Sequence, residues 1–172
     1  MPAFATTGER TKVKQNPTRL RILENDYWQS RTARFLSDYR FNGQTVTSVF
    51  GQFSDYDLVL PDGTTAELKR DTNAAHTGNV AIEISRRGPD GEQIPSGLSV
   101  TKADWFMFLV PDPKHLVHVY EIETERLKRL TPRLKQIPCN NGRTHCYLLP
   151  LDQLRKSEYI GYYPDSFARP AK

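Results

Sequence analysis

The chain has 172 residues, of which 37% are hydrophobic and 26% charged, and its formal net charge is +4. This length suits one domain with its own core, and this composition excludes an intrinsically disordered chain. No apolar run approaches the roughly 20 residues of a membrane helix, and the N-terminus lacks the apolar segment of a secretory signal. We therefore expect a cytoplasmic protein without a membrane partner, and the mild positive charge permits a nucleic-acid partner without requiring one.

The N-terminal part of the chain predicts an arm, a helix and a strand. Residues 1–15 are polar and basic without apolar periodicity, so we expect a flexible arm there. A helix is predicted over 17–39, because Asn16 can cap it, Pro17 suits its first position and apolar residues follow at helical spacing. Residues 45–50 alternate and are rich in β-branched side chains, which predicts a strand.

A β-hairpin is predicted next. Its arms are residues 57–60 and 64–69, and its turn is Pro61-Asp62-Gly63. Proline presets the backbone angle of such a turn and glycine accepts a positive one. Together with strand 45–50, the hairpin makes a three-stranded antiparallel meander.

The rest of the chain predicts further strands and two helices. The run 105–110 is continuously apolar and aromatic, which favours a strand buried on both faces at the centre of a mixed sheet. The other predicted segments are a polar loop 71–79, a strand 80–84, a loop 86–95, a short helix or turn 99–104, a strand 116–122, a helix 123–134, a strand 144–149 and a short helix 150–156. We expect an α/β (α+β) fold with a helix on each face of the sheet, in one domain over 16–156, followed by a tail over 157–172 without clear structure.

The hairpin carries the strongest candidate site. Side chains alternate along a strand, so Glu67 and Lys69 share one face, and the turn can fold Asp57 back beside Glu67. Two adjacent carboxylates repel each other unless a cation compensates, and magnesium takes oxygen ligands of this kind. The backbone carbonyl of Leu68 would complete the ligand set, and Lys69 would orient or deprotonate a water or stabilise charge on a phosphate. The alternative is a half-exposed hairpin with a cross-strand lysine–carboxylate pair.

Other catalytic motifs are missing from the sequence. No Walker loop or dinucleotide glycine fingerprint occurs, so no nucleotide cofactor is expected. His145 and Cys146 are adjacent on a predicted strand and point to opposite faces, which excludes a nucleophile–base pair. With Cys139 they lack a fourth ligand at zinc spacing.

The run Asp57-x9-Glu67-Leu68-Lys69, placed after a helix and a strand, resembles the PD-(D/E)XK nuclease superfamily. The segments 78–83 and 96–105 and the late Leu149-Pro150-Leu151 are similar to its phage-type members, and Holliday-junction resolvases are another related group. The resemblance covers roughly residues 17–155. It implies a restriction-endonuclease-like core with a central mixed β-sheet flanked by helices, in a bacterial or phage-encoded protein.

The resemblance also implies a role for each site residue. Asp57 and Glu67 become metal ligands, Lys69 becomes the catalytic lysine, and Glu24 matches an acidic residue that many members place on the first helix. The expected activity is magnesium-dependent hydrolysis of DNA by an endonuclease, with manganese able to substitute. A homodimer would supply the two sites that two-strand cutting needs. Six basic side chains are candidates for DNA contact: Arg19, Arg31, Arg70, His76, Arg86 and Arg87.

Two alternatives stay open. Glu24 can instead form an ordinary surface ion pair with a nearby arginine. The whole chain can instead be a non-catalytic DNA-binding or structural protein that retains the nuclease fold.

Overall fold

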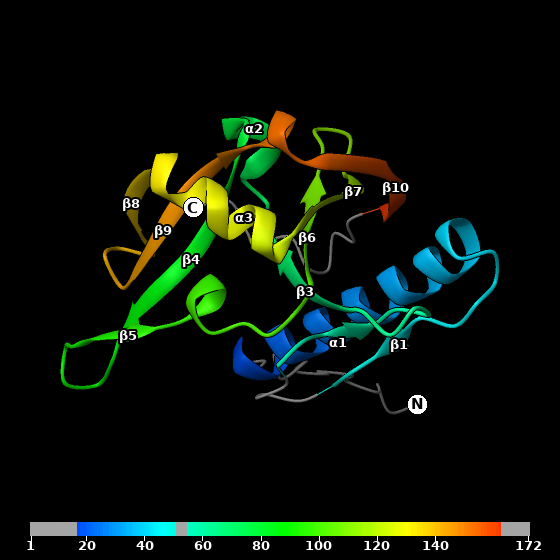
Figure 1. Ribbon diagram of the computed structural model, residues 1–172, viewed down its shortest axis with the longest axis horizontal. Helices are drawn as coiled ribbons and strands as arrows, with labels where there is room; N and C mark the ends of the chain where they lie inside the picture. The colour runs from blue at the N-terminus through cyan, green and yellow to red at the C-terminus, as the bar shows by residue number, and fades with distance from the viewer. Residues whose placement is uncertain (1–16, 51–54, 163–172) are drawn as a thin grey trace, which may run out of the picture.

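A computed structural model describes residues 17–50 and 55–162 of the chain (Figure 1). The side chains of 17–21, 23 and 158–162 are outside this description, as are the predicted arm 1–15 and residues 163–172. Within the described ranges, no helix has the length and apolar character needed to cross a membrane.

The described chain is a mixture of helices and strands, as the sequence predicts. In order, the elements are α1 (Pro17–Phe35), a π-helical turn (Leu36–Arg40), β1 (Thr47–Ser48), β2 (Leu58–Val59), β3 (Thr65–Arg70), α2 (Ala74–Thr77), β4 (Asn79–Arg87), β5 (Gln93–Pro95), a 3-10 turn (Gly97–Ser99), β6 (Trp105–Pro111), β7 (Leu116–Glu123), α3 (Thr124–Leu130), a 3-10 turn (Thr131–Arg133), β8 (Lys135–Cys139), β9 (Thr144–Pro150), a 3-10 turn (Leu151–Gln153) and β10 (Arg155–Tyr162).

A six-stranded mixed sheet forms the centre of the molecule, with strand order β1-β2-β3-β6-β7-β10. Its neighbours pair antiparallel except β3 and β6, which run parallel. The predicted antiparallel meander is therefore confirmed as β1, β2 and β3. The predicted central strand is confirmed as β6, in which Phe106 to Val110 are all buried.

Each face of this sheet packs on a separate core cluster. On one face, Met107 and Leu109 of β6 pack with Trp28 of α1 and with Leu36 of the π-helical turn that follows it. On the other face, the alternate residues of β6 pack against side chains of β4, β9 and α3: Phe106, Phe108, Val80, Ile82, Leu149 and Leu127. Helices flank the sheet on both faces, as predicted, and Figure 1 shows α1 and α3 on different sides of β3 and β6.

A second, four-stranded sheet with order β5-β4-β9-β8 lies over the second face. Of these four strands, the sequence predicts only β4 and β9. Its prediction of a loop over 86–95 was wrong, because β4 continues to Arg87 and pairs with β5. Both missed strands are at the edges and contain a proline, Pro95 in β5 and Pro138 in β8, which an edge strand tolerates and a central strand does not.

The C-terminal end of the described chain also differs from the prediction. In place of a short helix over 150–156, a single 3-10 turn leads into β10, which pairs antiparallel with β7. The absence of regular structure predicted from 157 is therefore wrong as far as Tyr162. The β10 ladder has two register shifts, and an irregular edge strand of this kind leaves no clean alternation in the sequence.

Smaller differences concern element lengths. The predicted loop 71–79 contains the single-turn helix α2, which ends at Gly78 with a left-handed φ of +71°. The strand predicted over 45–50 pairs only at Thr47 and Ser48. The helix predicted over 123–134 ends at Leu130 and continues as a 3-10 turn containing Pro132.

Candidate active site

The hairpin that carries the site folds as its sequence predicts. Leu60 N donates to the Thr64 carbonyl at 2.7 Å, and Gly63 N donates to the Leu60 carbonyl at 2.9 Å. Gly63 has a φ of +83°, which glycine adopts without steric cost. The resulting register places Leu58 opposite Ala66, so Asp57 comes to lie beside the middle of β3.

Just before β2, the side chain of Asp57 accepts a hydrogen bond from β3 where a backbone carbonyl would otherwise do so. Its backbone N–H donates to the carbonyl of Ala66 at 2.9 Å, although Ala66 is already the partner of Leu58 in the β2–β3 register. At the next step its side chain takes over, because Oδ2 accepts a 2.6 Å hydrogen bond from Leu68 N. The other oxygen, Oδ1, accepts a 2.5 Å hydrogen bond from Gln29 Nε2 on α1. The carboxylate is thus fixed between β3 and α1.

The carbonyl of Leu68 belongs to the same corner. In a β-strand, the N–H and C=O of one residue point to the same edge. Leu68 N points toward Asp57, so the Leu68 carbonyl faces that edge as well, beyond the last paired residue of β2. The Leu68 carbonyl, which is the expected third ligand, therefore lies on the same side of β3 as Asp57.

Glu67 and Lys69 share a face of β3, as predicted. They are in register with Phe106 and Phe108 of the parallel neighbour β6, on the face of the second core cluster. Lys69 Nζ forms an ion pair with Glu67 Oε1. The Glu67 side chain is 16% exposed and the Lys69 side chain 42%, so the cluster is buried at its carboxylates and open to solvent at its amine.

Burial dominates the electrostatics of both carboxyl groups. Burial raises the pKa of Asp57 above its ordinary value, against the opposing effects of the Leu68 N–H, the Lys69 charge and the Gln29 amide. Burial also raises the pKa of Glu67, and the neighbouring Asp57 charge adds to the rise while Lys69 opposes it. The two carboxylates therefore interact, and Lys69 compensates them only in part.

Glu24 does not join this cluster. It is buried on α1 and forms an ion pair with Arg70 Nη1 at the end of β3. Arg70 is in register with Leu109 of the first core cluster, so this pair belongs to the α1 face, whereas Glu67 and Lys69 belong to the opposite face. The ion-pair alternative for Glu24 thus describes what the structure contains, with a buried pair in place of a surface one.

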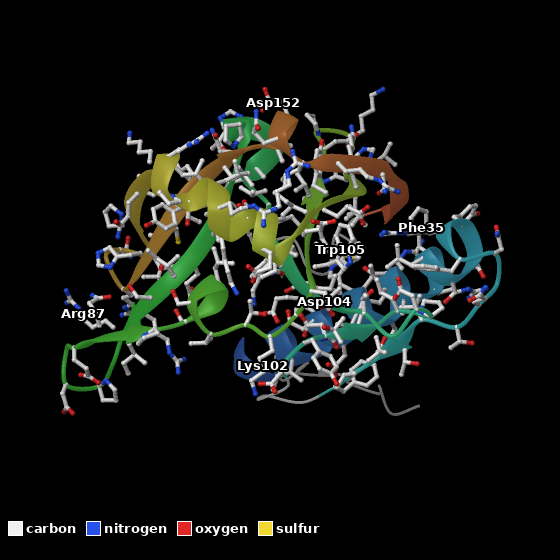
Figure 2. All side chains as sticks on the ribbon, viewed as in Figure 1. Phe35, Arg87, Lys102, Asp104, Trp105 and Asp152 are labelled. Atoms are coloured by element: carbon white, nitrogen blue, oxygen red, sulfur yellow. The ribbon has the colours of Figure 1, made fainter. Side chains whose placement is uncertain are left out.

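The expected DNA contacts are spread over the molecule. Arg70 is engaged by Glu24, and the Arg19 side chain is outside the described part. Arg31, His76, Arg86 and Arg87 are exposed. Figure 2 shows Arg87 at the far end of the β4–β5 hairpin, away from Trp105, the partner of Ala66 in β3. Arg86 and Arg87 are thus not neighbours of the site.

Sequence reasoning missed Gln29, which holds Asp57 from α1. Its side chain is 9% exposed. A signal was present, since Gln29 precedes the buried residues Ala33 and Leu36 at helical spacing and is therefore a polar residue within the apolar stripe of the helix.

The oxygen atoms available around Asp57 suit a hard divalent cation as ligands. They are the carboxylates of Asp57 and Glu67 and the Leu68 carbonyl, all oxygen ligands of the kind that magnesium prefers. Each oxygen of Asp57 accepts one hydrogen bond, which leaves lone pairs on both for a metal. Among the residues that the structure describes, no group of three or more His, Cys, Asp or Glu side chains is arranged to hold a metal ion, so the carbonyl and water would supply the other ligands.

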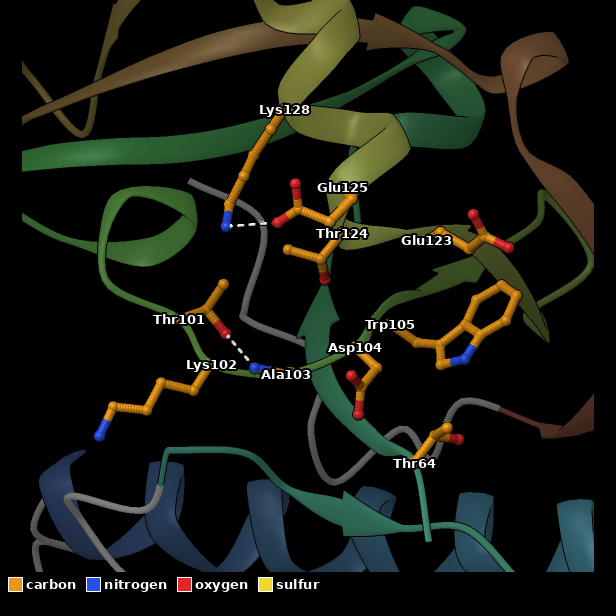
Figure 3. Close-up of a pocket in the computed structure, with 10 residues that line it drawn as sticks. All are labelled: Thr64, Thr101, Lys102, Ala103, Asp104, Trp105, Glu123, Thr124, Glu125 and Lys128. Atoms are coloured by element: carbon orange, nitrogen blue, oxygen red, sulfur yellow. Dashed lines mark hydrogen bonds and ion pairs between the residues drawn. The ribbon is translucent and has the colours of Figure 1, made fainter. Parts of the chain in front are cut away.

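A cavity of about 410 Å³ lies nearby, at the amino-terminal ends of β3 and β6 (Figure 3). Its wall includes Thr64, Asp104 and Trp105 together with Thr124 at the start of α3. The lysines at its wall are already paired, Lys128 with Glu125 and Lys102 with Asp55. None of the candidate catalytic residues lines this cavity.

The chain matches no protein-family model, and no curated protein sequence matches it either.

Proposed function

We propose that this protein is a magnesium-dependent DNA nuclease of the PD-(D/E)XK type. One observation carries the proposal: the hairpin brings two largely buried carboxylates, Asp57 and Glu67, together beside Lys69. Two buried negative charges are unfavourable side by side, and a cation that binds between them during function would compensate both.

The arrangement of elements supports a restriction-endonuclease-like core. α1 precedes the meander, the site lies on β2 and β3, and the chain then crosses over to β6, which pairs parallel with β3. The resemblance implies the order helix, three-stranded meander, helix and further strand, and the α-helix between β3 and β6 is here the four-residue α2. The crossover contains α2 and the β4–β5 hairpin, and the second face carries a sheet in addition to α3.

The proposed roles follow from the geometry of each group. Asp57, Glu67 and the Leu68 carbonyl would hold the metal, which would supply Lewis-acid polarisation of a phosphate and acidification of a water. Lys69, whose amine reaches solvent, orients the attacking water and neutralises charge on the phosphate oxygens. Water attacks phosphorus and releases a proton to solvent, the P–O bond to the departing oxygen breaks, and that oxygen takes up a proton from solvent.

A second candidate is a non-catalytic protein that retains the fold. The pairing of the three acidic residues favours it, because Glu24 is bound by Arg70, Glu67 by Lys69 and Asp57 by Gln29 and the Leu68 N–H. Such a protein would bind DNA, or support an assembly, without cutting.

The test is cleavage of plasmid, linear and branched DNA with magnesium, with manganese and with EDTA. The nuclease proposal expects metal-dependent cleavage by the full chain and its loss in Asp57→Asn, Glu67→Gln and Lys69→Met. Matched controls are Asp152→Asn and Lys135→Met, which change exposed side chains outside the six-stranded sheet.

The pattern of results separates the two candidates. Binding of DNA without cleavage of any substrate, in either metal, supports the non-catalytic protein. Cleavage that survives in Asp57→Asn and Lys69→Met places the chemistry elsewhere and rejects the proposed site.

A further inference from the structure

Gln29 joins α1 to the candidate metal site through a single short contact. Its Nε2 donates to Asp57 Oδ1 at 2.5 Å, and its side chain is buried. The orientation of this amide follows from its partner, because turning it around would place Oε1 against a carboxylate oxygen. Nε2 is therefore the atom that faces Asp57.

This orientation leaves the other end of the amide without a partner. Gln29 Oε1 is buried and accepts no hydrogen bond within the described part of the chain. A buried acceptor without a donor costs about 1–3 kcal/mol, and such atoms in proteins usually have an ordered water or ion as partner. Oε1 is bonded to the same amide carbon as Nε2, so it lies in the immediate neighbourhood of the Asp57 carboxylate. Magnesium sites commonly retain several waters, which are the donors that such an acceptor needs.

We propose that Gln29 is a positioning residue of the metal site, with Nε2 fixing the Asp57 carboxylate and Oε1 accepting a hydrogen bond from a water in the site. This inference rests on the proposed function. It assigns α1 a role that Glu24 was expected to fill, since Glu24 is bound to Arg70. Groups that orient a metal ligand in this way typically contribute 10- to 100-fold to metal affinity.

The test is the affinity of the full-length protein for Mn²⁺, measured by calorimetry or by electron paramagnetic resonance without DNA. We compare wild type with Gln29→Met, which keeps the shape and removes both polar atoms. Gln29→Asn keeps an amide and withdraws it by one methylene. The matched control is Thr32→Val on the same helix. Thr32 is buried, and its hydroxyl, like Gln29 Oε1, has no hydrogen-bond partner in the described part of the chain.

The expected result is a 10- to 100-fold loss of Mn²⁺ affinity in both Gln29 variants and no loss in Thr32→Val. If Gln29 only stabilises the fold, the variants change the melting temperature but bind Mn²⁺ as tightly as wild type, which overturns the inference and leaves the nuclease proposal intact. If wild type itself binds no Mn²⁺, both proposals fall. Gln29→Asn keeps the test decisive should Gln29→Met fail to fold.

Discussion

Replacing Asp57 by Asn is expected to stabilise the metal-free protein at neutral pH. Burial raises the pKa of this carboxyl group, which means that the folded protein holds its charged form at a cost. Asn keeps an oxygen that accepts from Leu68 N, and its amide can donate to Gln29 Oε1 once the glutamine amide turns, because that atom lacks a partner in the described chain. The substitution therefore removes the buried charge and leaves the number of unpaired Gln29 atoms unchanged, because Nε2 takes the position that Oε1 held.

The expected gain is about 1 kcal/mol, within the range that relief of an unfavourable functional group typically gives. For a domain of this size that corresponds to a rise of about 2–4 °C in melting temperature. Magnesium reverses the order, since a ligand at ten times its dissociation constant stabilises wild type by about 1.4 kcal/mol and leaves Asp57→Asn unaffected.

The gain also has a defined dependence on pH. The carboxyl groups of Asp57 and Glu67 bind protons more tightly in the folded than in the unfolded state, because their folded pKa values are raised. Their contribution to stability is therefore fully present below the ordinary values of 3.8 and 4.5 and is lost as the pH rises through the folded values. The advantage of Asp57→Asn over wild type should thus be larger at pH 7 than at pH 4.

Differential scanning fluorimetry at pH 4 and pH 7, with EDTA or magnesium, measures all of these effects. Asp152→Asn, an exposed residue, is the control. A melting temperature of Asp57→Asn below that of wild type at pH 7 in EDTA would refute the reasoning, because the ion pair with Lys69 would then outweigh the cost of burial.

Three further predictions concern the fold. Glu121→Gln should lower the free energy of unfolding in urea by about 3 kcal/mol, because the buried Glu121 pairs with Arg40 at 2.5 Å and with Arg155 at 3.2 Å. Lys102→Met, which removes an exposed ion pair, should cost less than about 1 kcal/mol. Equal losses in the two variants would contradict this reasoning. Gly97→Ala should cost more than Gly142→Ala in the same assay, by about 1–3 kcal/mol, because both glycines have a positive φ but a Cβ at Gly97 would lie 2.2 Å from the Glu83 carbonyl oxygen. Iodoacetamide at pH 8 should label Cys139 and spare the native Cys146, because burial raises the pKa of the Cys146 thiol to about 12; preferential labelling of Cys146 by mass spectrometry would be the opposite result.

Local signals were sufficient to predict the hairpin and the central strand. The Pro61-Asp62-Gly63 turn fixes the register that brings Asp57 to Ala66 and Leu68, so the neighbourhood of Asp57, Glu67 and Lys69 follows from the sequence. The continuous apolar run of β6 likewise predicts burial on both faces. Both features depend on residues close together in the chain.

The parts that were missed depend on contacts between distant residues. The edge strands β5, β8 and β10 form because a neighbour offers free hydrogen-bonding groups. Their own sequences signal a strand weakly, because β5 and β8 contain a proline and the β10 ladder has two register shifts. The pairing of Glu24 with Arg70, and of Gln29 with Asp57, is decided by how α1 packs across β3. Spacing along the chain does not specify which polar residue of that helix meets which strand residue.

We propose above that Asp57, Glu67 and Lys69 form a metal-dependent site for DNA hydrolysis. The most direct measurement is the single-turnover rate of DNA cleavage at saturating magnesium for wild type and Lys69→Met, with Mn²⁺ affinity determined on the same samples. Lys69→Met is expected to retain metal binding and to lose at least about 100-fold in rate, because the lysine acts on the water and the phosphate. Equal rates for the two proteins, or cleavage by wild type that persists in EDTA, would contradict it.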